Sequence, residues 1–183
     1  METSDIVAVL LAESGGEICG KTKIQKEMYF LSMVLRKDLD FRAYYYGPYS
    51  EDVRRGQDQL IGLGFVNMRR EALGMEPKGG FEVTRYDFEL TESGIRLAEW
   101  LQKKHPEESR KIRKFIEQLR SIGNPNYLSL SLAAKVHYIL GKNGRLTRAE
   151  IRENARDLGW TITEEDIDGA VRILDELGFV KTD

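Results

Sequence analysis

Residues 15–22, which read GGEICGKT, have the spacing of a phosphate-binding loop. Such a loop holds nucleotide phosphates with backbone N–H groups, a lysine and a hydroxyl, and it follows a strand of a parallel sheet. The preceding IVAVLLAES could be that strand, but no alternation of strands and helices follows, and no apolar strand ends in a metal-binding aspartate. We therefore favour a turn in which Gly20 leads into a capped second helix over nucleotide binding.

The histidines and the cysteine form no catalytic or metal-binding pattern. His105 precedes a proline in a charged segment, and His137 lies within an apolar helical segment. Neither has a cysteine or a second histidine at zinc-ligand spacing, and no nucleophile, base and orienting residue stand out. The sequence thus predicts no enzyme, no cofactor and no metal. The single cysteine, Cys19, excludes an intramolecular disulfide, which fits a reducing cytosol.

Four of the eight tyrosines lie within residues 44–50, YYYGPYS. Pro48 disfavours helix at Gly47, so the chain must turn there, and Ser50 stands where the N-cap of a helix belongs. One hypothesis is that this stretch seats the next helix, with Tyr45 packed inward and the other rings at the helix entrance, near a phosphate or a partner. The alternative is a stacking platform for single-stranded nucleic acid, which needs exposed rings in a basic groove. We favour the structural role.

The hydrophobic pattern predicts helix, helix, short strand, helix, hairpin and helix, which is the order of a winged helix-turn-helix. Ser4, Ser50 and Thr91 are the expected N-caps of the first, third and fourth helices. The expected segments are helices at 4–14, 21–37, 51–63 and 92–104, strands at 41–46, 65–70 and 81–90, and a connecting loop at 71–80.

A second unit is predicted after a charged linker helix. Gly123–Asn126 ends the linker, and helices are expected at 130–140, 147–158 and 163–177, with Thr147 and Thr163 as N-caps. QLIGLGFV (59–66) resembles ILDELGFV (173–180), which suggests a weak internal repeat. The predicted fold is mainly α with a small β-hairpin (α+β). Its parts are a winged helix-turn-helix at 1–104, a linker helix at 105–126 and a three-helix, winged-helix-like module at 127–183.

Charge is distributed unevenly along the chain. The net charge is −2 and the pI about 5.9, so nucleic-acid binding would require a local basic patch. In the predicted fold the third helix would enter the major groove and the hairpin would hold the backbone. Arginine suits guanine edges and phosphates, and glutamine can read adenine. The alternative is an ordinary solvated helix face. Acidic residues at 51 and 52 suit the helix dipole but repel phosphate. The candidate DNA contacts are Lys21, Lys23, Tyr49, Ser50, Arg54, Arg55, Gln57, Gln59, Arg69, Arg70 and Arg85.

The last predicted helix is acidic. Residues 163–183 contain seven acidic and two basic side chains, which makes a poor DNA reader. Arg148, Arg152 and Arg156 form a stripe at i, i+4 and i+8, which we interpret as a surface ladder paired with nearby acids rather than as a phosphate site. The C-terminal module is therefore expected to contact a second copy of the chain or another protein.

Two segments carry a resemblance to a known group of proteins. They are the helix with Lys23, Gln25, Lys26 and Tyr29, and the turn at 46–50, YGPYS. Together with LAAKVHYIL and ELGFV, they resemble an uncharacterised archaeal and bacterial group of winged-helix regulators, loosely similar to the Panacea (SocA-like) antitoxins. The resemblance covers most of the chain and implies a regulator or an antitoxin-like binding protein.

Two functions follow from the sequence. The first is a dimeric transcriptional regulator that binds double-stranded DNA. The alternative is a protein-interaction adaptor, or an antitoxin-like protein, that keeps the winged-helix shape without binding DNA. The longest apolar run near the start, residues 6–12, is too short to span a bilayer, and no basic segment precedes it. We expect a soluble cytoplasmic protein with no membrane partner.

Overall fold

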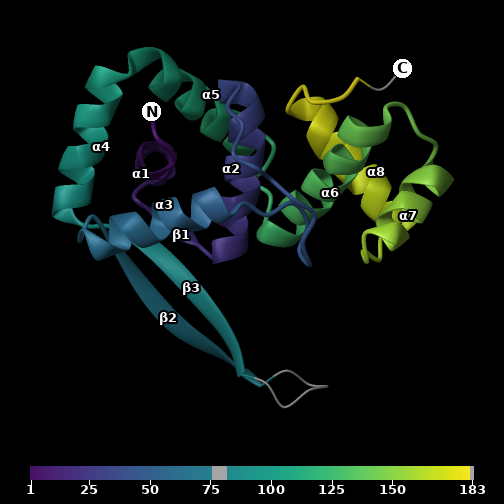
Figure 1. Ribbon diagram of the computed structural model, residues 1–183, viewed down its shortest axis with the longest axis horizontal. Helices are drawn as coiled ribbons and strands as arrows, with labels where there is room; N and C mark the ends of the chain where they lie inside the picture. The colour runs from purple at the N-terminus through teal and green to yellow at the C-terminus, as the bar shows by residue number, and fades with distance from the viewer. Residues whose placement is uncertain (76–81, 182–183) are drawn as a thin grey trace.

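A computed structural model describes residues 1–75 and 82–181 (Figure 1). The described part is mainly helical with a small antiparallel sheet, as the sequence predicts. The N-terminal half contains α1 (Thr3–Glu13), β1 (Glu17–Cys19), α2 (Lys21–Leu35), α3 (Glu51–Gly62), β2 (Val66–Met75), β3 (Glu82–Leu90) and α4 (Glu92–Lys104). The C-terminal half contains α5 (Pro106–Ser121), α6 (Tyr127–Asn143), α7 (Arg148–Asp157) and α8 (Glu164–Glu176).

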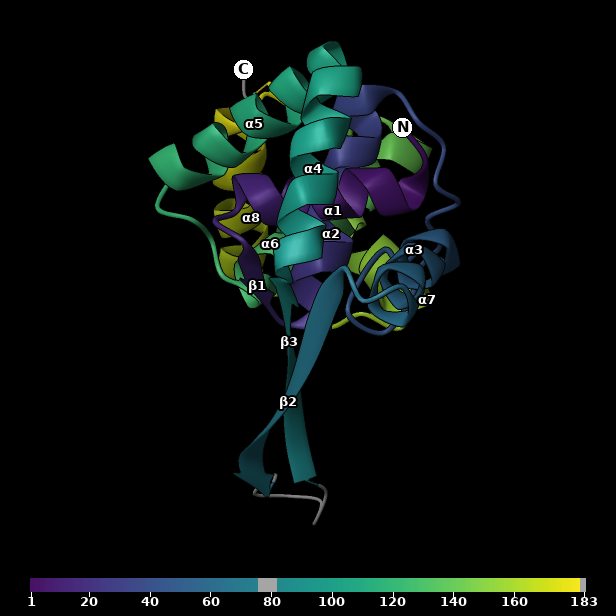
Figure 2. The same cartoon turned by 90° about the vertical axis from the view of Figure 1, so that its left-hand side faces the viewer.

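The sheet has the strand order β1-β3-β2, and both pairs are antiparallel. Phe88 of β3 lies opposite Ile18 on one side and Met68 on the other. Beyond this point β2 and β3 continue as a two-stranded arm that projects away from the helices (Figures 1 and 2). The predicted strand at 65–70 is thus longer, because its pairing with β3 continues through Glu71 and Ala72. The rest of the predicted loop, residues 76–80, lies outside the described residues.

The short strand expected at 41–46 was wrong. Arg42 and Tyr49 exchange both backbone hydrogen bonds at 2.9 Å, but this bridge is isolated. The chain between them reverses in a turn closed by the Gly47 N–H and the Tyr44 carbonyl at 2.9 Å, so no ladder extends from the bridge. The third strand of the sheet is instead β1, which the sequence analysis had assigned to a helix-connecting turn.

The expected N-caps are confirmed at four helices. Ser50, Thr91, Thr147 and Thr163 each accept a hydrogen bond from the backbone N–H three residues later. These caps satisfy donors that a helix cannot pair internally. The cap of α1 differs: it is Glu2, which forms a capping box with Asp5, so the prediction of Ser4 was wrong.

The buried apolar residues form a continuous core across both halves. In Figure 1, α1 is seen end-on between α3, α4 and α5, and it contacts all three. Its residues 6–11 are buried on every face. Helix α5, expected as a linker, packs on α1 and α2, while α6 packs on α2 and α8. Phe30 of α2 joins the two halves, because its ring lies beside the rings of Phe115 (6.4 Å between centroids) and Phe179 (5.0 Å). Within the described residues, none of the helices combines the length and apolar character needed to cross a membrane.

Candidate functional site

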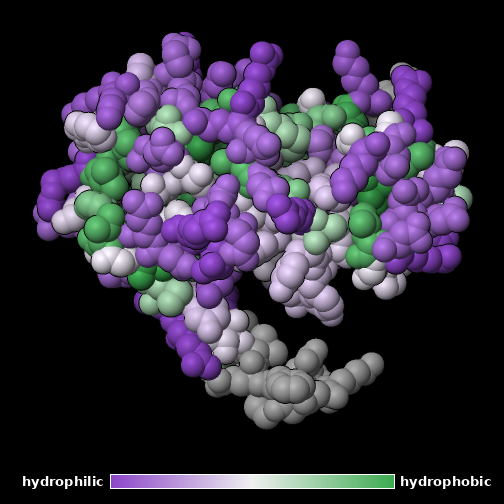
Figure 3. All heavy atoms as spheres, viewed as in Figure 1, coloured by the Kyte–Doolittle hydropathy of each residue, from purple (hydrophilic) through white to green (hydrophobic). Residues whose placement is uncertain are grey.

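Three consecutive tyrosine rings project from the turn between α2 and α3. Tyr44, Tyr45 and Tyr46 are 64%, 74% and 51% exposed. The prediction that Tyr45 packs inward was therefore wrong: its ring contacts that of Tyr46 edge-on, at 4.8 Å between centroids, and faces solvent. Figure 3 shows a pale projection at the place where Figure 1 draws this turn. We call residues 44–49 the tyrosine turn.

Two polar side chains of α2 hold the tyrosine turn from inside the protein. The Gln25 amide donates to the Ser50 carbonyl and accepts from the Ser50 N–H, both at 3.0 Å. The Lys26 ammonium donates to the Pro48 carbonyl at 2.6 Å, although only 1% of Lys26 is exposed. Burial, with a smaller contribution from Lys135, lowers the pKa of Lys26 to about 7. These bonds join the two segments that carry the resemblance: side chains of the helix at 23–29 hold the backbone of the turn at 46–50.

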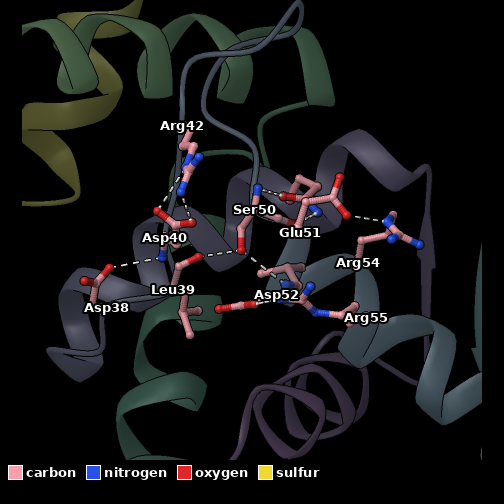
Figure 4. Close-up of polar contacts among 11 residues, drawn as sticks. Asp38, Leu39, Asp40, Arg42, Ser50, Glu51, Asp52, Arg54 and Arg55 are labelled. Atoms are coloured by element: carbon pink, nitrogen blue, oxygen red, sulfur yellow. Dashed lines mark hydrogen bonds and ion pairs between the residues drawn. The ribbon is translucent and has the colours of Figure 1, made fainter.

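The chain on either side of the turn is also fixed by hydrogen bonds (Figure 4). The Ser50 hydroxyl donates to the Leu39 carbonyl and accepts from the Val53 N–H at 3.2 Å. Asp40, whose φ is 46°, donates its N–H to Asp38 and binds Arg42 through its carboxylate. Ser50 is fully buried, which contradicts its predicted contact with DNA; it instead caps α3 and binds Leu39 and Gln25.

The C-terminal half supports the turn from the other side. The Trp160 indole N–H donates to the Tyr44 carbonyl at 2.7 Å. Gly47 has a φ of 96° and packs so closely on α6 that a Cβ there would lie 3.0 Å from Lys135 Cγ. Nearby, the Tyr29 hydroxyl and His137 Nδ1 are 2.9 Å apart, and burial lowers the pKa of His137. The backbone of the turn is therefore rigid, while its rings remain exposed.

The arginines of α3 are paired with acids of the same helix (Figure 4). Arg54 lies 2.7 Å from both Glu51 and Asp58, and Arg55 pairs with Asp52. These pairs are at i, i+3 and i, i+4 spacing, where helix neighbours meet. Each pair is exposed and therefore adds little to stability, but the acids place negative charge on the surface predicted to meet phosphate.

The predicted DNA contacts do not form one surface. Lys21, Tyr49, Arg54 and Gln57 line a cavity of about 220 Å³ between α2, α3 and the sheet. Gln57 is buried, which contradicts its predicted role in reading adenine, because its amide faces the protein interior. Gln59 and Arg55 are exposed on α3, whereas Lys23 lies on another side of α2 against Glu27 and Asn124.

The arginines of the hairpin also have acidic partners. Arg69 pairs with Glu17 of β1, and Arg85 pairs with Glu71 and, at 2.9 Å, with Asp87. Arg70 donates to Thr84 at 3.5 Å. The helix α3, the sheet and the start of α2 thus contain seven basic and eight acidic residues. The basic residues are Lys21, Lys23, Arg54, Arg55, Arg69, Arg70 and Arg85, and the acidic ones are Glu17, Glu51, Asp52, Asp58, Glu71, Glu82, Asp87 and Glu89.

One cluster on the sheet has the composition of a metal site. Ligand atoms of Glu17, Cys19 and Asp87 lie within 4.8 Å of one another. Arg69 holds the Glu17 carboxylate and Arg85 holds both oxygens of Asp87, so the arginines already neutralise the acids. Desolvation and the two carboxylates raise the pKa of Cys19, which disfavours the thiolate that binds metals.

Residues 15–22 do not have the architecture of a phosphate-binding loop. The segment read as a possible preceding strand is α1, and the strand β1 lies inside the motif itself. Gly20, with a φ of 95°, is the residue before α2. The segment therefore connects two helices, as expected, but it includes a strand, and Gly20 precedes α2 without a side-chain cap.

On the C-terminal module, the arginine ladder is confirmed at two of its three positions. Arg148 pairs with Asp168 at 2.7 Å and Arg152 with Glu164 at 3.2 Å, which joins α7 to α8.

Sequence reasoning missed the supporting roles of Lys26 and Trp160. Lys26 had a signal, because the polar residues QKE (25–27) stand between the apolar residues Ile24 and Met28, whereas nothing local marks Trp160.

Comparisons with known proteins add little to this geometry. No family model matches the chain. The uncharacterised protein YwgA of Bacillus subtilis (strain 168) is 35% identical over 85 residues, which are 43% of this chain and 44% of that protein. The chain therefore matches less than half the length of this relative, whose name states no activity.

Proposed function

We propose that the protein is a regulator or adaptor of winged-helix shape that acts by binding another protein through the tyrosine turn. The observation that carries the proposal is the exposure of Tyr44, Tyr45 and Tyr46 on a backbone fixed by buried hydrogen bonds. Tyrosine is enriched among the residues that dominate protein interfaces, because its ring buries a large area and its hydroxyl finds a polar partner.

Rigidity of the turn favours this function. Binding a flexible loop costs conformational entropy, whereas a loop that is already fixed avoids most of that cost. Gln25, Lys26 and Trp160 fix the backbone while leaving the rings free to contact a partner. The charged residues that line the surface beside the rings are balanced: Asp40 and Glu51 accompany Arg42 and Arg55. Such a surface suits a protein better than single-stranded nucleic acid, which needs a basic groove.

The experiment compares partner recovery between matched variants. The tagged full-length chain is crosslinked in its host cells and recovered as wild type, as Tyr45→Ser with Tyr46→Ser, and as Tyr127→Ser. Tyr127 is 46% exposed at the start of α6 and serves as the control. Truncating a hot-spot residue of an interface, a class enriched in tyrosine, costs about 2 kcal/mol or more. A protein recovered with the wild type and the control should therefore be reduced at least ten-fold with the double variant.

Equal recovery with all three chains would refute the proposal. Because the two substituted rings are exposed, the thermal midpoint of the double variant should equal that of the wild type. This comparison separates loss of binding from loss of folding.

DNA binding is the second candidate, favoured by the element order α1-β1-α2-α3-β2-β3 and by the projecting hairpin. It is tested with a fluorescent random-sequence duplex between about 50 and 200 mM salt. Binding that weakens steeply with salt and is lost in Arg54→Ala with Arg55→Ala, but not in the α4 control Arg96→Ala, would establish it. Because α3, the sheet and the start of α2 contain at least as many acidic as basic residues, we expect no such binding.

A further inference from the structure

A separate cavity of about 170 Å³ lies between β1, the first half of α2 and the end of α5. Its apolar walls include Ile18, Ile116 and Leu119. Its volume corresponds to roughly six water molecules at ~30 Å³ each. Cavities that bind nucleotides or drug-sized molecules are larger, about 300–1,000 Å³. The cavity can therefore hold only a small molecule of about six non-hydrogen atoms.

Glu27 lines this cavity, and its buried carboxyl group lacks a complete set of partners. Glu27 is only 2% exposed. Its Oε1 lies 3.8 Å from the Lys23 ammonium, and its Oε2 has no hydrogen-bond partner in the described part of the chain. A buried polar atom left without a partner destabilises the fold, because it has lost its bond to water without replacing it. Burial raises the pKa of Glu27 to about 7, and the attraction of Lys23 opposes this only in part.

Donors line the same cavity. The Lys23 ammonium donates to the Asn124 side-chain carbonyl at 3.2 Å, and the Arg120 guanidinium donates to the Glu13 backbone carbonyl at 2.6 Å. An ammonium carries three N–H donors and a guanidinium five, so these bonds leave both groups with donors to offer. Asn124 has a φ of 49° just beyond α5, a conformation that asparagine adopts more readily than most residues.

We propose that this cavity binds a small zwitterion of the amino-acid type. Its ammonium group donates to Glu27 Oε2, and its carboxylate accepts from Lys23 and Arg120. One molecule of this class supplies both the donor that the buried acid lacks and the acceptor that the two cations require. The apolar walls leave room for a short side chain.

Other ligand classes fit less well. A divalent cation such as Ca²⁺ is held by several oxygen ligands. Within the described residues, Glu27 belongs to no group of three metal-ligating side chains, since the group on the sheet contains Glu17, Cys19 and Asp87. A simple anion would leave Glu27 Oε2 unpaired, and a simple amine would leave the donors of the two cations unused.

The test is isothermal titration of the full-length protein with L-alanine, L-serine and glycine. Three control probes separate the two charges: acetate carries only the carboxylate, methylamine carries only the ammonium group, and glycerol carries neither. We expect at least one amino acid to bind ten-fold or more tightly than any of these three. Glu27→Gln and Lys23→Met should each weaken binding at least ten-fold, whereas Glu117→Gln, an exposed change on α5, should leave it unchanged.

A second experiment measures the protons that the protein releases when the ligand binds. The charged or titratable groups lining the cavity are Lys23 and Glu27 on α2, Glu17 and Cys19 on β1, and Arg120 on α5. At a pH near 6 the folded protein holds Glu27 mostly protonated, so a bound ammonium should release a proton. Titrations in two buffers of different ionisation enthalpy detect this release. The proposal is overturned if no amino acid binds at millimolar concentration, if glycerol binds equally well, or if Glu27→Gln binds as the wild type does.

Discussion

Lys26 offers the sharpest test of how the tyrosine turn is held. Its ammonium group lies inside the protein, where it donates to the Pro48 carbonyl, and burial lowers its pKa from 10.5 to about 7. Replacing it by methionine keeps the length and apolar character of the side chain but removes the titrating group. The expected result is a change in how the free energy of unfolding depends on pH.

The sign and size of the change follow from proton linkage. Between about pH 7 and 10.5 the unfolded chain binds a proton that the folded chain has lost, so stability rises with pH across this window. One pKa unit corresponds to about 1.4 kcal/mol. From about pH 7 to about pH 8.5 the wild type should gain about 2 kcal/mol relative to Lys26→Met. Lys135, the other cation near this amine, is unchanged in both proteins.

Urea unfolding at constant ionic strength measures this difference at pH values of about 6, 7, 8 and 8.5. The control is Lys114→Met, an exposed change on α5 that should follow the wild type at every pH. Parallel curves for wild type and Lys26→Met would show that the amine stays charged throughout, and the reasoning from burial would fail.

Two further predictions concern the packing around the turn and the hairpin. Gln25→Ala leaves the buried N–H of Ser50 without a partner, whereas the Ser50 carbonyl keeps its bond from the Arg54 N–H. The change should therefore cost about 1–3 kcal/mol in urea unfolding. The exposed control Gln59→Ala should cost less than about 0.5 kcal/mol, and equal losses would contradict the role of Gln25. Gly94→Ala would place its Cβ 2.0 Å from a backbone carbonyl oxygen, so we expect at least about 3 kcal/mol of destabilisation. In Gly62→Ala the added Cβ meets no atom within 4 Å, so this change should instead stabilise α3 by up to about 1 kcal/mol. If Gly94→Ala and Gly62→Ala shift the thermal midpoint in the same direction, the packing argument is wrong.

Local features of the fold were predicted well because their causes are local. An N-cap needs only a short polar side chain at the start of a helix, so Ser50, Thr91, Thr147 and Thr163 could be recognised from the sequence. The alternation of β3 and the reversal at Gly47 have equally local causes. The existence of the helices and the hairpin followed from the same short-range rules.

The candidate site was predicted less well. The pairing of Arg54 with Glu51 and Asp58 was readable from their spacing, and it weakens the expectation of a DNA-reading helix. The exposure of Tyr45 was not readable, because alternation assigns a side only when a strand forms, and this turn forms none.

The sequence by itself determined where the helices begin, where the chain turns and which segments are apolar, since these depend on neighbours within about four residues along the chain. Only the tertiary structure decided which polar groups are buried. Gln25, Lys26 and Glu27 became buried because α2 is covered by α5, α6 and the turn. Strand β1 formed because β3 lies beside it, some 70 residues later in the chain. Such contacts join segments that are distant in sequence, so no local pattern of residue types can specify them.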